Sequence, residues 1–262
     1  MTKPFLSDYG TYDESTVPRL WDGVVGAWCP SLGPTGGRLH DFSKNNNWGT
    51  LTNMDPATDW VVNGDQYSLD FDGVNDVVTM TPGIVTGTQA FTMSAWARLN
   101  SNPTFYRGVF MMGGGATGNS AWIGWATTTQ NGALYSWGGG GFGRNYGSGV
   151  TDYSGWHHLV LTSSGGSTQT FNIYVDGGNN VTGSETITLT SSHLRIGSNP
   201  TDAPTDGNID DIKLWNRALA VNEVRELYLL GRGGMFQRRR VRRFYVSQAV
   251  NRRRRLICGA EC

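Results

Sequence analysis

Apolar and polar residues alternate over several short stretches of the chain, the pattern expected of β-strands with one buried face. The longest alternation covers residues 91–99, where Phe, Met, Ala, Ala and Leu occupy every second position. A second covers residues 171–175, and Asp176 and Gly177 directly after it have the composition of a tight hairpin turn. Short strands separated by turn residues predict an all-β fold, an antiparallel two-sheet β-sandwich of the jelly-roll type.

One segment has helical periodicity instead. Apolar residues recur at i, i+3 and i+4 from Val224 onward, which predicts one short C-terminal helix over residues 221–230. Gly231 follows and predicts the end of that helix. Ala220 occupies the position before its first turn. Because alanine cannot accept a bond from the free N–H groups there, we expect the helix start to be weaker by about 1 kcal/mol.

These patterns divide the chain into three parts. Residues 1–19 are polar and interrupted by prolines, and we interpret them as an N-terminal arm. Residues 20–231 contain the strands and the helix and form one predicted domain, long enough to bury a sizeable core. Residues 232–262 form a basic, arginine-rich C-terminal tail.

The order of several motifs within residues 20–231 is similar to that of a known family. The motifs, in chain order, are LHDFSKNNNWGTLTNMD (39–55), SLDFDGVNDVVTM (68–80), FTMSAWARL (91–99), WHHLVLT (156–162), FNIYVDG (171–177), LRIGS (194–198) and GNIDDIKLWNRALAVNEVRELY (207–228). Together they resemble laminin G-like, concanavalin A-like lectin/glucanase domains. The resemblance implies the concanavalin A-like jelly roll, but that fold hosts lectins, adhesion modules, hydrolases and structural spacers, so it implies no single function.

A second resemblance concerns the opening of the domain together with the tail. Residues 21–55, joined to an arginine-rich end, are similar to laminin G-like proteins encoded in phage structural gene clusters. This resemblance implies a structural component of a virion.

The formal net charge of zero hides a division of charge along the chain. From Arg232 to the end there are ten arginines and one acid, giving about +9, while the rest holds eleven basic and twenty acidic residues, giving −9. Such asymmetry indicates an anionic partner for the tail, which we expect to be other virion proteins or copies of the chain itself. Nucleic acid bound by the tail alone is an alternative. The anchoring residues predicted in the tail are Arg238, Arg239, Arg240, Arg242, Arg243, Arg252, Arg253, Arg254 and Arg255.

Cysteine content and the chain start give further expectations. Cys29, Cys258 and Cys262 are too few for a disulfide scaffold, and both three reduced thiols and a bond from Cys29 to the tail or between subunits are alternatives. The first residues lack the pattern of a signal peptide, and no stretch approaches the ~20 apolar residues of a membrane span. We therefore expect synthesis in the host cytoplasm, a place on the virion surface, and no membrane partner.

Few residues suit catalysis. The family resemblance implies that a glucanase would carry paired acids of the ExDxxE type on one strand, and a retaining glycosidase needs carboxyl groups about 5 Å apart. Only Glu14, Glu185, Glu223 and Glu226 precede the tail, and no strand offers such a pair of glutamates. The adjacent histidines 157–158 point to opposite faces of a strand, so they cannot hold one metal together. We predict that the protein is not an enzyme.

Two acidic turns are candidate calcium sites, since calcium takes six to eight oxygen ligands from carboxylates, carbonyls and water. The resemblance implies one calcium at the rim of the sandwich, held by an aspartate and backbone carbonyls. Asp72 and Asp211 match the family motifs and are the predicted metal ligands. The alternative is structural: Asp72 caps its turn, and Asp211 hydrogen-bonds the backbone of a neighbouring loop.

The middle of the chain is rich in aromatic residues interleaved with glycine, asparagine and arginine. Such a composition suits stacking on sugar rings or a protein interface. We take Trp137, Phe142, Arg144 and Tyr146 as the candidate ligand-binding residues. The alternative is that most of these aromatics fill the core or line subunit contacts.

These observations lead to one expectation and, beside a nucleic-acid-binding protein that uses the tail alone, two further rivals. We expect a non-enzymatic virion structural protein, a capsid decoration or a component of a tail or fibre, whose lectin-like sandwich is anchored by the arginine tail. The first rival is a free carbohydrate-binding module that recognises glycans through loop aromatics. The second, a glycan hydrolase, is disfavoured by the missing acids.

Overall fold

The computed structural model describes residues 17–236 except 64–65, 82, 102, 104–105, 115–118, 126–133, 138–142, 147–152, 192 and 199–203. At positions 63, 134–137, 143–146, 179–181, 185 and 232–236 only the backbone is described. The regular elements are α1 (Pro18–Trp21), β1 (Val24–Trp28), the 3₁₀ turn η3 (Pro30–Leu32), β2 (Arg38–Leu39), β3 (Gly49–Thr52), β4 (Trp60–Asn63), β5 (Gln66–Asp72), β6 (Val77–Thr79), β7 (Phe91–Leu99), β8 (Arg107–Gly113), β9 (Ser120–Trp125), β10 (Leu134–Trp137), β11 (Gly143–Tyr146), β12 (His157–Ser163), β13 (Gln169–Val175), β14 (Gly178–Glu185), β15 (His193–Ile196), β16 (Asp206–Trp215) and α2 (Val221–Phe236).

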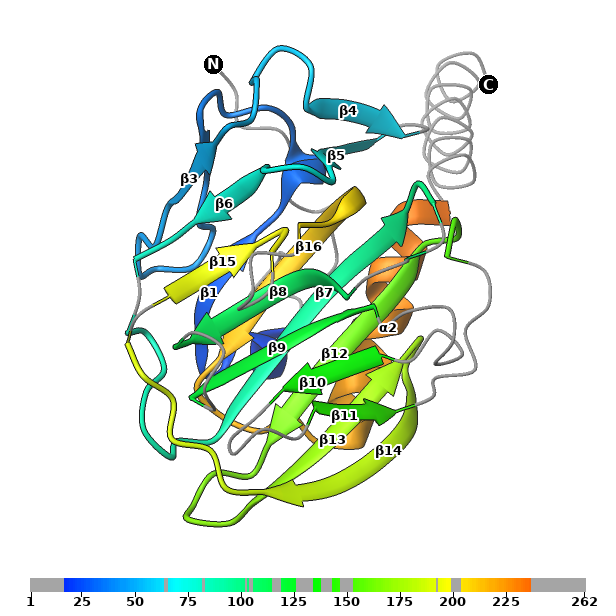
Figure 1. Ribbon diagram of the computed structural model, residues 1–262. Coiled ribbons are helices and arrows are strands. Elements are labelled where there is room, and N and C mark those ends of the chain that lie inside the picture. Colours follow the sequence, from blue (N-terminus) through cyan, green and yellow to red (C-terminus); the bar gives the residue numbers. More distant parts are fainter. Residues whose placement is uncertain are drawn as a thin grey trace, which may run out of the picture.

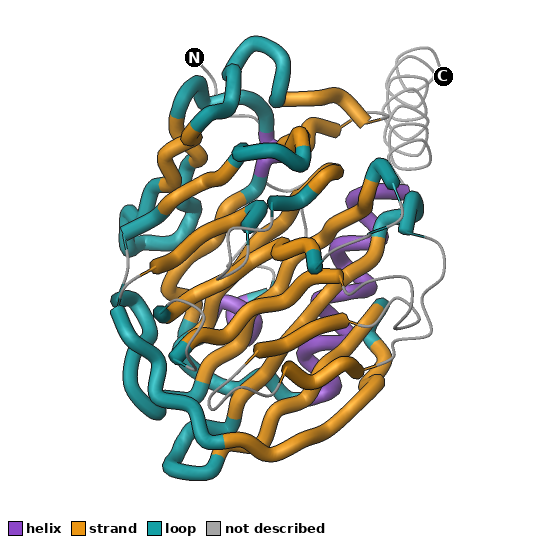
Figure 2. The backbone as a smooth tube through the Cα atoms, viewed as in Figure 1, coloured by secondary structure: helices purple, strands orange, loops and turns teal. Residues whose placement is uncertain are grey.

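The strands form two eight-stranded antiparallel sheets that pack face to face (Figure 1). Sheet A has the order β14-β13-β12-β7-β16-β5-β4, and β1 pairs with the second half of β16. Sheet B has the order β11-β10-β9-β8-β15-β6-β3-β2. Strands dominate the chain, and the long helix α2 lies on the outward side of sheet A (Figure 2). The predicted antiparallel jelly-roll sandwich with one C-terminal helix is therefore confirmed.

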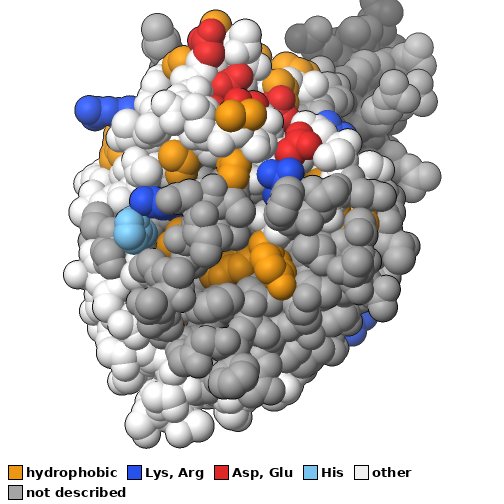
Figure 3. All heavy atoms as spheres, viewed as in Figure 1, with side chains coloured by type: hydrophobic (Ala, Val, Ile, Leu, Met, Phe, Trp, Pro, Cys, Tyr) orange, Lys and Arg blue, Asp and Glu red, His pale blue; other side chains and the backbone are white. Residues whose placement is uncertain are grey.

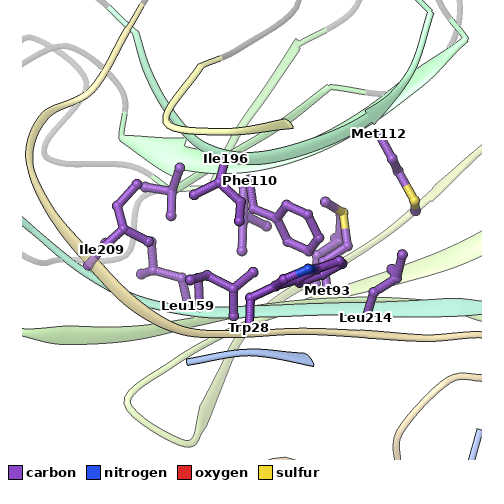
Figure 4. Packing of buried hydrophobic residues seen from close by; sticks show 14 of the residues in the cluster. Trp28, Met93, Phe110, Met112, Leu159, Ile196, Ile209 and Leu214 are labelled. Atoms are coloured by element: carbon purple, nitrogen blue, oxygen red, sulfur yellow. The ribbon is translucent and has the colours of Figure 1, made fainter. Parts of the chain in front are cut away.

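The main core lies between the two sheets. The alternation predicted for β7 is present, and Phe91, Met93 and Leu99 project into this core with at most 2% of their surface exposed. Trp28 of β1 meets Phe110 of β8 edge to face, with ring centroids 5.9 Å apart (Figure 4). Burying large apolar side chains from both sheets removes the most hydrocarbon surface from water and is the main stabilising contribution to such a fold.

The outward side of sheet A is also buried, because α2 covers it. Val224 and Leu227 of α2 pack with Val160 of β12 and Trp215 of β16 in a second apolar cluster. Tyr228 of α2 stacks on Trp96 of β7, with ring centroids 5.7 Å apart and an interplanar angle of 16°. The helix is thus held by an apolar stripe, as its spacing predicts.

The end predicted for this helix at Gly231 is wrong, since α2 continues to Phe236. Gly231 serves a different purpose. A Cβ atom built there would lie 2.5 Å from Nε1 of Trp96, so the absence of a side chain lets the helix backbone lie directly on the indole. Glycine in a helix can mark close packing as well as a C-terminal end.

The start of α2 has a cap that the sequence did not indicate. The carboxylate of Glu223 accepts a hydrogen bond from the N–H of Ala220 at 2.8 Å, which is one half of a capping box. The same carboxylate binds both terminal nitrogens of Arg217, at 2.9 and 2.8 Å. The hydrogen bonds from Arg217, opposed by partial burial, lower the pKa of Glu223.

Residues 17–22 are tied to the same region. Nε1 of Trp215 donates to the carbonyl of Leu20 at 2.8 Å, and Arg217 donates to the carbonyls of Arg19 and Asp22. Arg217 therefore joins the first described residues, the end of β16 and the start of α2. None of the described helices is long and apolar enough to cross a membrane.

Candidate functional site

Asp72 is the last residue of β5, where the turn to β6 begins, at one end of the sandwich. Its Oδ1 accepts hydrogen bonds from the N–H groups of Val74 (2.7 Å) and Asn75 (3.2 Å), while its own N–H donates to Asp76 (3.0 Å). Gly73, with φ +76°, makes the turn possible. Asp72 thus caps its turn, as in the structural alternative; a role in binding calcium stays a prediction.

Asp72 belongs to a group of carboxylates that we call the acidic rim, made of Asp59, Asp70, Asp72, Asp76 and Asp206. Asp206 opposes Asp72 across β16 and β5 and accepts bonds from Asn100 and Ser101. Burial raises the pKa of Asp70 and Asp76, and neighbouring carboxylates add to this rise. Figure 3 shows acidic side chains gathered at the top of the molecule. Within the described residues, no group of three or more His, Cys, Asp or Glu side chains is arranged to hold a metal ion.

Asp211 lies elsewhere, in the middle of β16. It occupies a β-bulge with φ +49° and forms an ion pair with Lys213, and both side chains are almost fully buried. The position opposite Asp72 on β16 is Asp206, five residues before Asp211, which corresponds to about 16 Å along a strand. The two predicted metal ligands therefore do not share a site.

The surroundings of Asp211 form a buried polar cluster on the outward side of sheet A. Asp210 is 2% exposed, and its Oδ1 accepts a bond from the N–H of Ser31 at 3.0 Å. Burial, and then the charge of Asp211, raise the pKa of Asp210 to about 7. Burial likewise raises the pKa of the free thiol of Cys29, whose sulfur lies 3.1 Å from the hydroxyl of Ser31. A buried neutral thiol is a poor nucleophile.

The adjacent histidines point to opposite faces of β12, as predicted. His158 is fully buried and lies 2.9 Å from the hydroxyl of Ser94, and burial lowers the pKa of its imidazole to about 4. His157 instead contacts Asp176 at 2.8 Å and lies edge to face with Trp125 of the core. Each imidazole therefore contacts other side chains of the fold, and the two rings do not share a site.

Three of the four candidate ligand residues lie on the hairpin of β10 and β11. The register pairs Trp137 with Gly143, Ser136 with Arg144 and Leu134 with Tyr146. Positions 144 and 146 therefore share one face of the hairpin, and position 137 lies on the opposite face. Phe142 lies outside the described residues, as do all nine tail arginines from Arg238 to Arg255 and the cysteines at 258 and 262.

The sequence did not indicate one loop that is fixed by many hydrogen bonds in the structure. In residues 41–47, Asp41 is 2% exposed and its two oxygens accept four hydrogen bonds, from the N–H groups of Ala27, Ser43 and Asn47 and the hydroxyl of Ser43, at 2.7 to 2.9 Å. Directly after this loop, Trp48 is 40% exposed. The spacing of Asp41, Ser43 and Asn47 before an aromatic residue was the signal available in the sequence.

Comparison with known proteins establishes the family. The model of the concanavalin A-like lectin/glucanases superfamily matches residues 72–225, more than half of the chain. The chain belongs to this superfamily, as the order of its motifs indicates. No curated protein matches its sequence.

Solved structures with the same fold include sugar-related proteins. Domain 4 of AbnA, an extracellular GH43 arabinanase from Geobacillus stearothermophilus in complex with arabinotriose, has a TM-score of 0.59 and 18% identity, covering 78% of this chain and 98% of that one. Trypanosoma rangeli sialidase in complex with sialic acid also has a TM-score of 0.59 and 18% identity, but the match covers 79% of this chain and 33% of the sialidase. The binding domain of Paraclostridial Mosquitocidal Protein 1 matches with the same score and identity, over 79% and 52%. At such identities the likeness shows the fold alone.

Proposed function

We propose that this chain is a non-catalytic, lectin-like module that binds glycans on the side of the sandwich formed by sheet B. The observation that carries the proposal is a separation of charge between the sheets. The strands of sheet A contain six acidic residues and two basic ones. The strands of sheet B contain no aspartate or glutamate, and their basic residues are Arg38, Arg107, Arg144, Arg195 and His193.

The outward side of sheet B also carries aromatic and apolar side chains outside the main core. Trp122 of β9 packs with Met111 of β8, and Tyr106 meets Trp122 edge to face at 6.4 Å. Met111 and Trp122 are almost fully buried, so this cluster supports the outward side of sheet B and is not itself a contact surface. Figure 3 shows hydrophobic side chains in the middle of this side, and Figure 1 shows α2 behind the two sheets, on the other side of the molecule. At the edge of this sheet, the ring of Trp48 is 40% exposed, and an exposed aromatic ring suits a sugar, whose rings have apolar faces edged by hydroxyls. The arabinotriose complex of a domain with this fold supports the proposal.

The absence of catalysis in this proposal rests on where the glutamates lie. Glu223 and Glu226 are on α2, where they pair with Arg217 and Arg19. Glu185 is on β14, at the far edge of sheet A. These positions do not suit the closely spaced carboxyl pair of a retaining glycosidase.

A panel of immobilised oligosaccharides tests the proposal. The intact chain should bind a subset of the panel, and the bound sugars should be recovered uncleaved after prolonged incubation. Release of new reducing ends would contradict the non-catalytic assignment, and a chain that binds no glycan would refute the proposal as a whole.

A second candidate function, assembly into a virion through the tail, is favoured by the acidic rim. Clustered carboxylates on the body complement a tail with a charge of about +9. In this candidate the tail of one copy, or the tail and another virion protein, would pair with acidic groups, and the chain would decorate a capsid, tail or fibre at the virion surface. Nucleic acid is the alternative partner of the tail.

Truncation after Phe236 separates these roles, because it leaves α2 complete. If the tail is an anchor, light scattering should show that the intact chain assembles and the truncated chain stays a folded monomer. Assembly that survives truncation would refute the anchor. If the intact chain binds DNA, with an affinity that falls steeply with salt, the partner is nucleic acid.

A further inference from the structure

We propose that Trp48, His40 and Arg38, at the edge of sheet B, form a binding subsite for a sugar unit that carries a carboxylate, such as a uronic acid. The proposal rests on the glycan-binding function above and names a place and a ligand class for it. The three residues belong to β2 and β3 and to the positions that directly adjoin them.

The subsite has a rigid base. The four hydrogen bonds to Asp41 fix residues 41–47, and Asn47 further binds β1, donating from Nδ2 to the carbonyl of Val25 at 2.7 Å. The carbonyl of Asn47 in turn accepts a bond from Nε1 of Trp28, a fully buried core residue, at 2.7 Å. Trp48 therefore follows a segment that is anchored to the core. A platform that is ordered before the ligand arrives loses little conformational entropy on binding.

The aromatic platform consists of three rings in contact. His40 meets Trp48 with centroids 4.4 Å apart and planes at 84°, and it meets Phe42 at 4.7 Å and 76°. These contacts fix the direction of the indole, while 40% of the Trp48 surface remains exposed. Among the residues whose side chains the structure describes, Trp48 is the one tryptophan that is classed as exposed. An exposed, oriented indole is the usual surface on which a sugar ring stacks.

The charge at this edge selects the ligand class. Arg38 pairs with Thr50 in the β2–β3 ladder, two positions from Trp48, so Arg38 and Trp48 are diagonal neighbours about 7 to 8 Å apart. The side chain of Arg38 is exposed, and no carboxylate in the described part of the chain forms an ion pair with it. Asp41, three residues after Arg38, is buried, with its oxygens directed at backbone N–H groups and a hydroxyl. A guanidinium can bind a carboxylate through two parallel hydrogen bonds.

A row of polar residues leads from the subsite across sheet B. Thr50 pairs with Thr79 of β6, and Thr79 pairs with Arg195 of β15. These positions form one cross-strand row that begins at Arg38 and ends beside Met111. A longer chain of sugar units can extend along this row, with the hydroxyl groups of Thr50 and Thr79 to bind.

Calorimetric titration of the intact chain with trigalacturonate and with its methyl ester, which lacks the charges, tests the proposal. We expect trigalacturonate to bind more tightly than the ester. Arg38→Gln should lower affinity for trigalacturonate about tenfold and leave the ester unchanged. Trp48→Ala should weaken both ligands. The control Leu229→Ala changes an exposed apolar residue of α2, on the other side of the molecule, and should change neither.

The outcomes separate this inference from the proposed function. If the intact chain binds other glycans but neither probe, or if Trp48→Ala binds like the intact chain, the subsite is refuted and the glycan-binding function stands. Equal affinity for the two probes refutes the selection by charge. A chain that binds no glycan at all refutes both. Because Arg38 is exposed, Arg38→Gln should keep the thermal unfolding temperature of the intact chain, and it still tests the subsite if Trp48→Ala, which also removes the ring contact with His40, loses stability.

Discussion

At the scale of single residues, the most unusual environment is that of the carboxylates on β16. A β-bulge turns Asp210 and Asp211 toward the same buried cluster, where Lys213 can neutralise only one of them. Asp210 therefore keeps its proton to a much higher pH than an exposed aspartate, with a pKa of about 7. Burial without a positively charged partner disfavours the ionised carboxylate relative to the protonated acid, and this raises the pKa of Asp210.

The shift makes stability depend on pH. The pKa of Asp210 is raised above its unfolded value of 3.8, so the folded state binds the proton more tightly. Its contribution to stability is complete below about pH 4 and is lost as the pH rises through about 7. We predict that Asp210→Asn, which keeps an oxygen for the N–H of Ser31, raises the thermal unfolding temperature by several degrees at pH 8. The gain should shrink steadily as the pH falls toward 4.

Thermal unfolding of both proteins across this pH range is the measurement. Asp72→Asn is the matched control, since Asp72 is exposed and asparagine can cap the same turn. A gain that is the same at all pH values would show that the pKa of Asp210 is not raised in the folded protein, and would contradict this account.

At the scale of elements, helix α2 depends on two contacts that the sequence pattern does not reveal. Gly231 lets the helix lie against Trp96, and Arg217 connects the helix start to residues 19 and 22. Both contacts join segments far apart in the chain. Local propensity predicted the stripe of Val224, Leu227 and Tyr228 correctly and placed the helix end too early.

Gly231→Ala tests the first contact. The new methyl group would overlap the indole of Trp96, so we predict a loss of about 1–3 kcal/mol in the free energy of unfolding despite the higher helix propensity of alanine. Chemical denaturation measures the loss. Asn222→Ala, at an exposed position of the same helix, should change stability by less than about 0.5 kcal/mol. Equal effects of the two substitutions would argue against close packing at Gly231.

Arg217→Met tests the second contact. It removes two bonds to Glu223 and the bonds to two carbonyls, and we predict a loss of about 1–2 kcal/mol, because these partly exposed bonds are screened by solvent. Hydrogen exchange should show faster exchange in the first turn of α2 and in residues 18–22. Arg225→Met, an exposed arginine on the same helix, is the control and should leave this exchange unchanged. Unchanged exchange in Arg217→Met would contradict the connecting role.

At the scale of the whole molecule, the two sheets differ in what surrounds them. The outward side of sheet A is covered by α2 and holds buried polar groups, while sheet B is free of acidic residues and bears the exposed Trp48. This division follows from the connections, because the chain ends its strands in β16 of sheet A and then folds α2 back onto that sheet. A binding function is therefore expected on the side of sheet B.

The sequence predicted the class of fold because strand alternation is local: the pattern at residues 91–99 depends only on which residues face a core. The site was harder to predict. Asp72 and Asp211 looked equivalent as acidic turns, yet one caps an exposed turn and the other is buried in a bulge, which depends on partners such as Lys213 and on η3. The sequence does not distinguish Trp48 from the other tryptophans, because its exposure depends on how residues 41–47 bind to β1.

The most direct test of the central claim is to locate a bound glycan on the intact chain by hydrogen exchange. With the tightest ligand from the oligosaccharide panel present, we predict slower exchange in β2, β3 and β6 and in residues 40–48, with α2 and β12 unchanged. Protection confined to α2 and the strands of sheet A, or no protection by any bound glycan, would contradict the claim that sheet B forms the binding side.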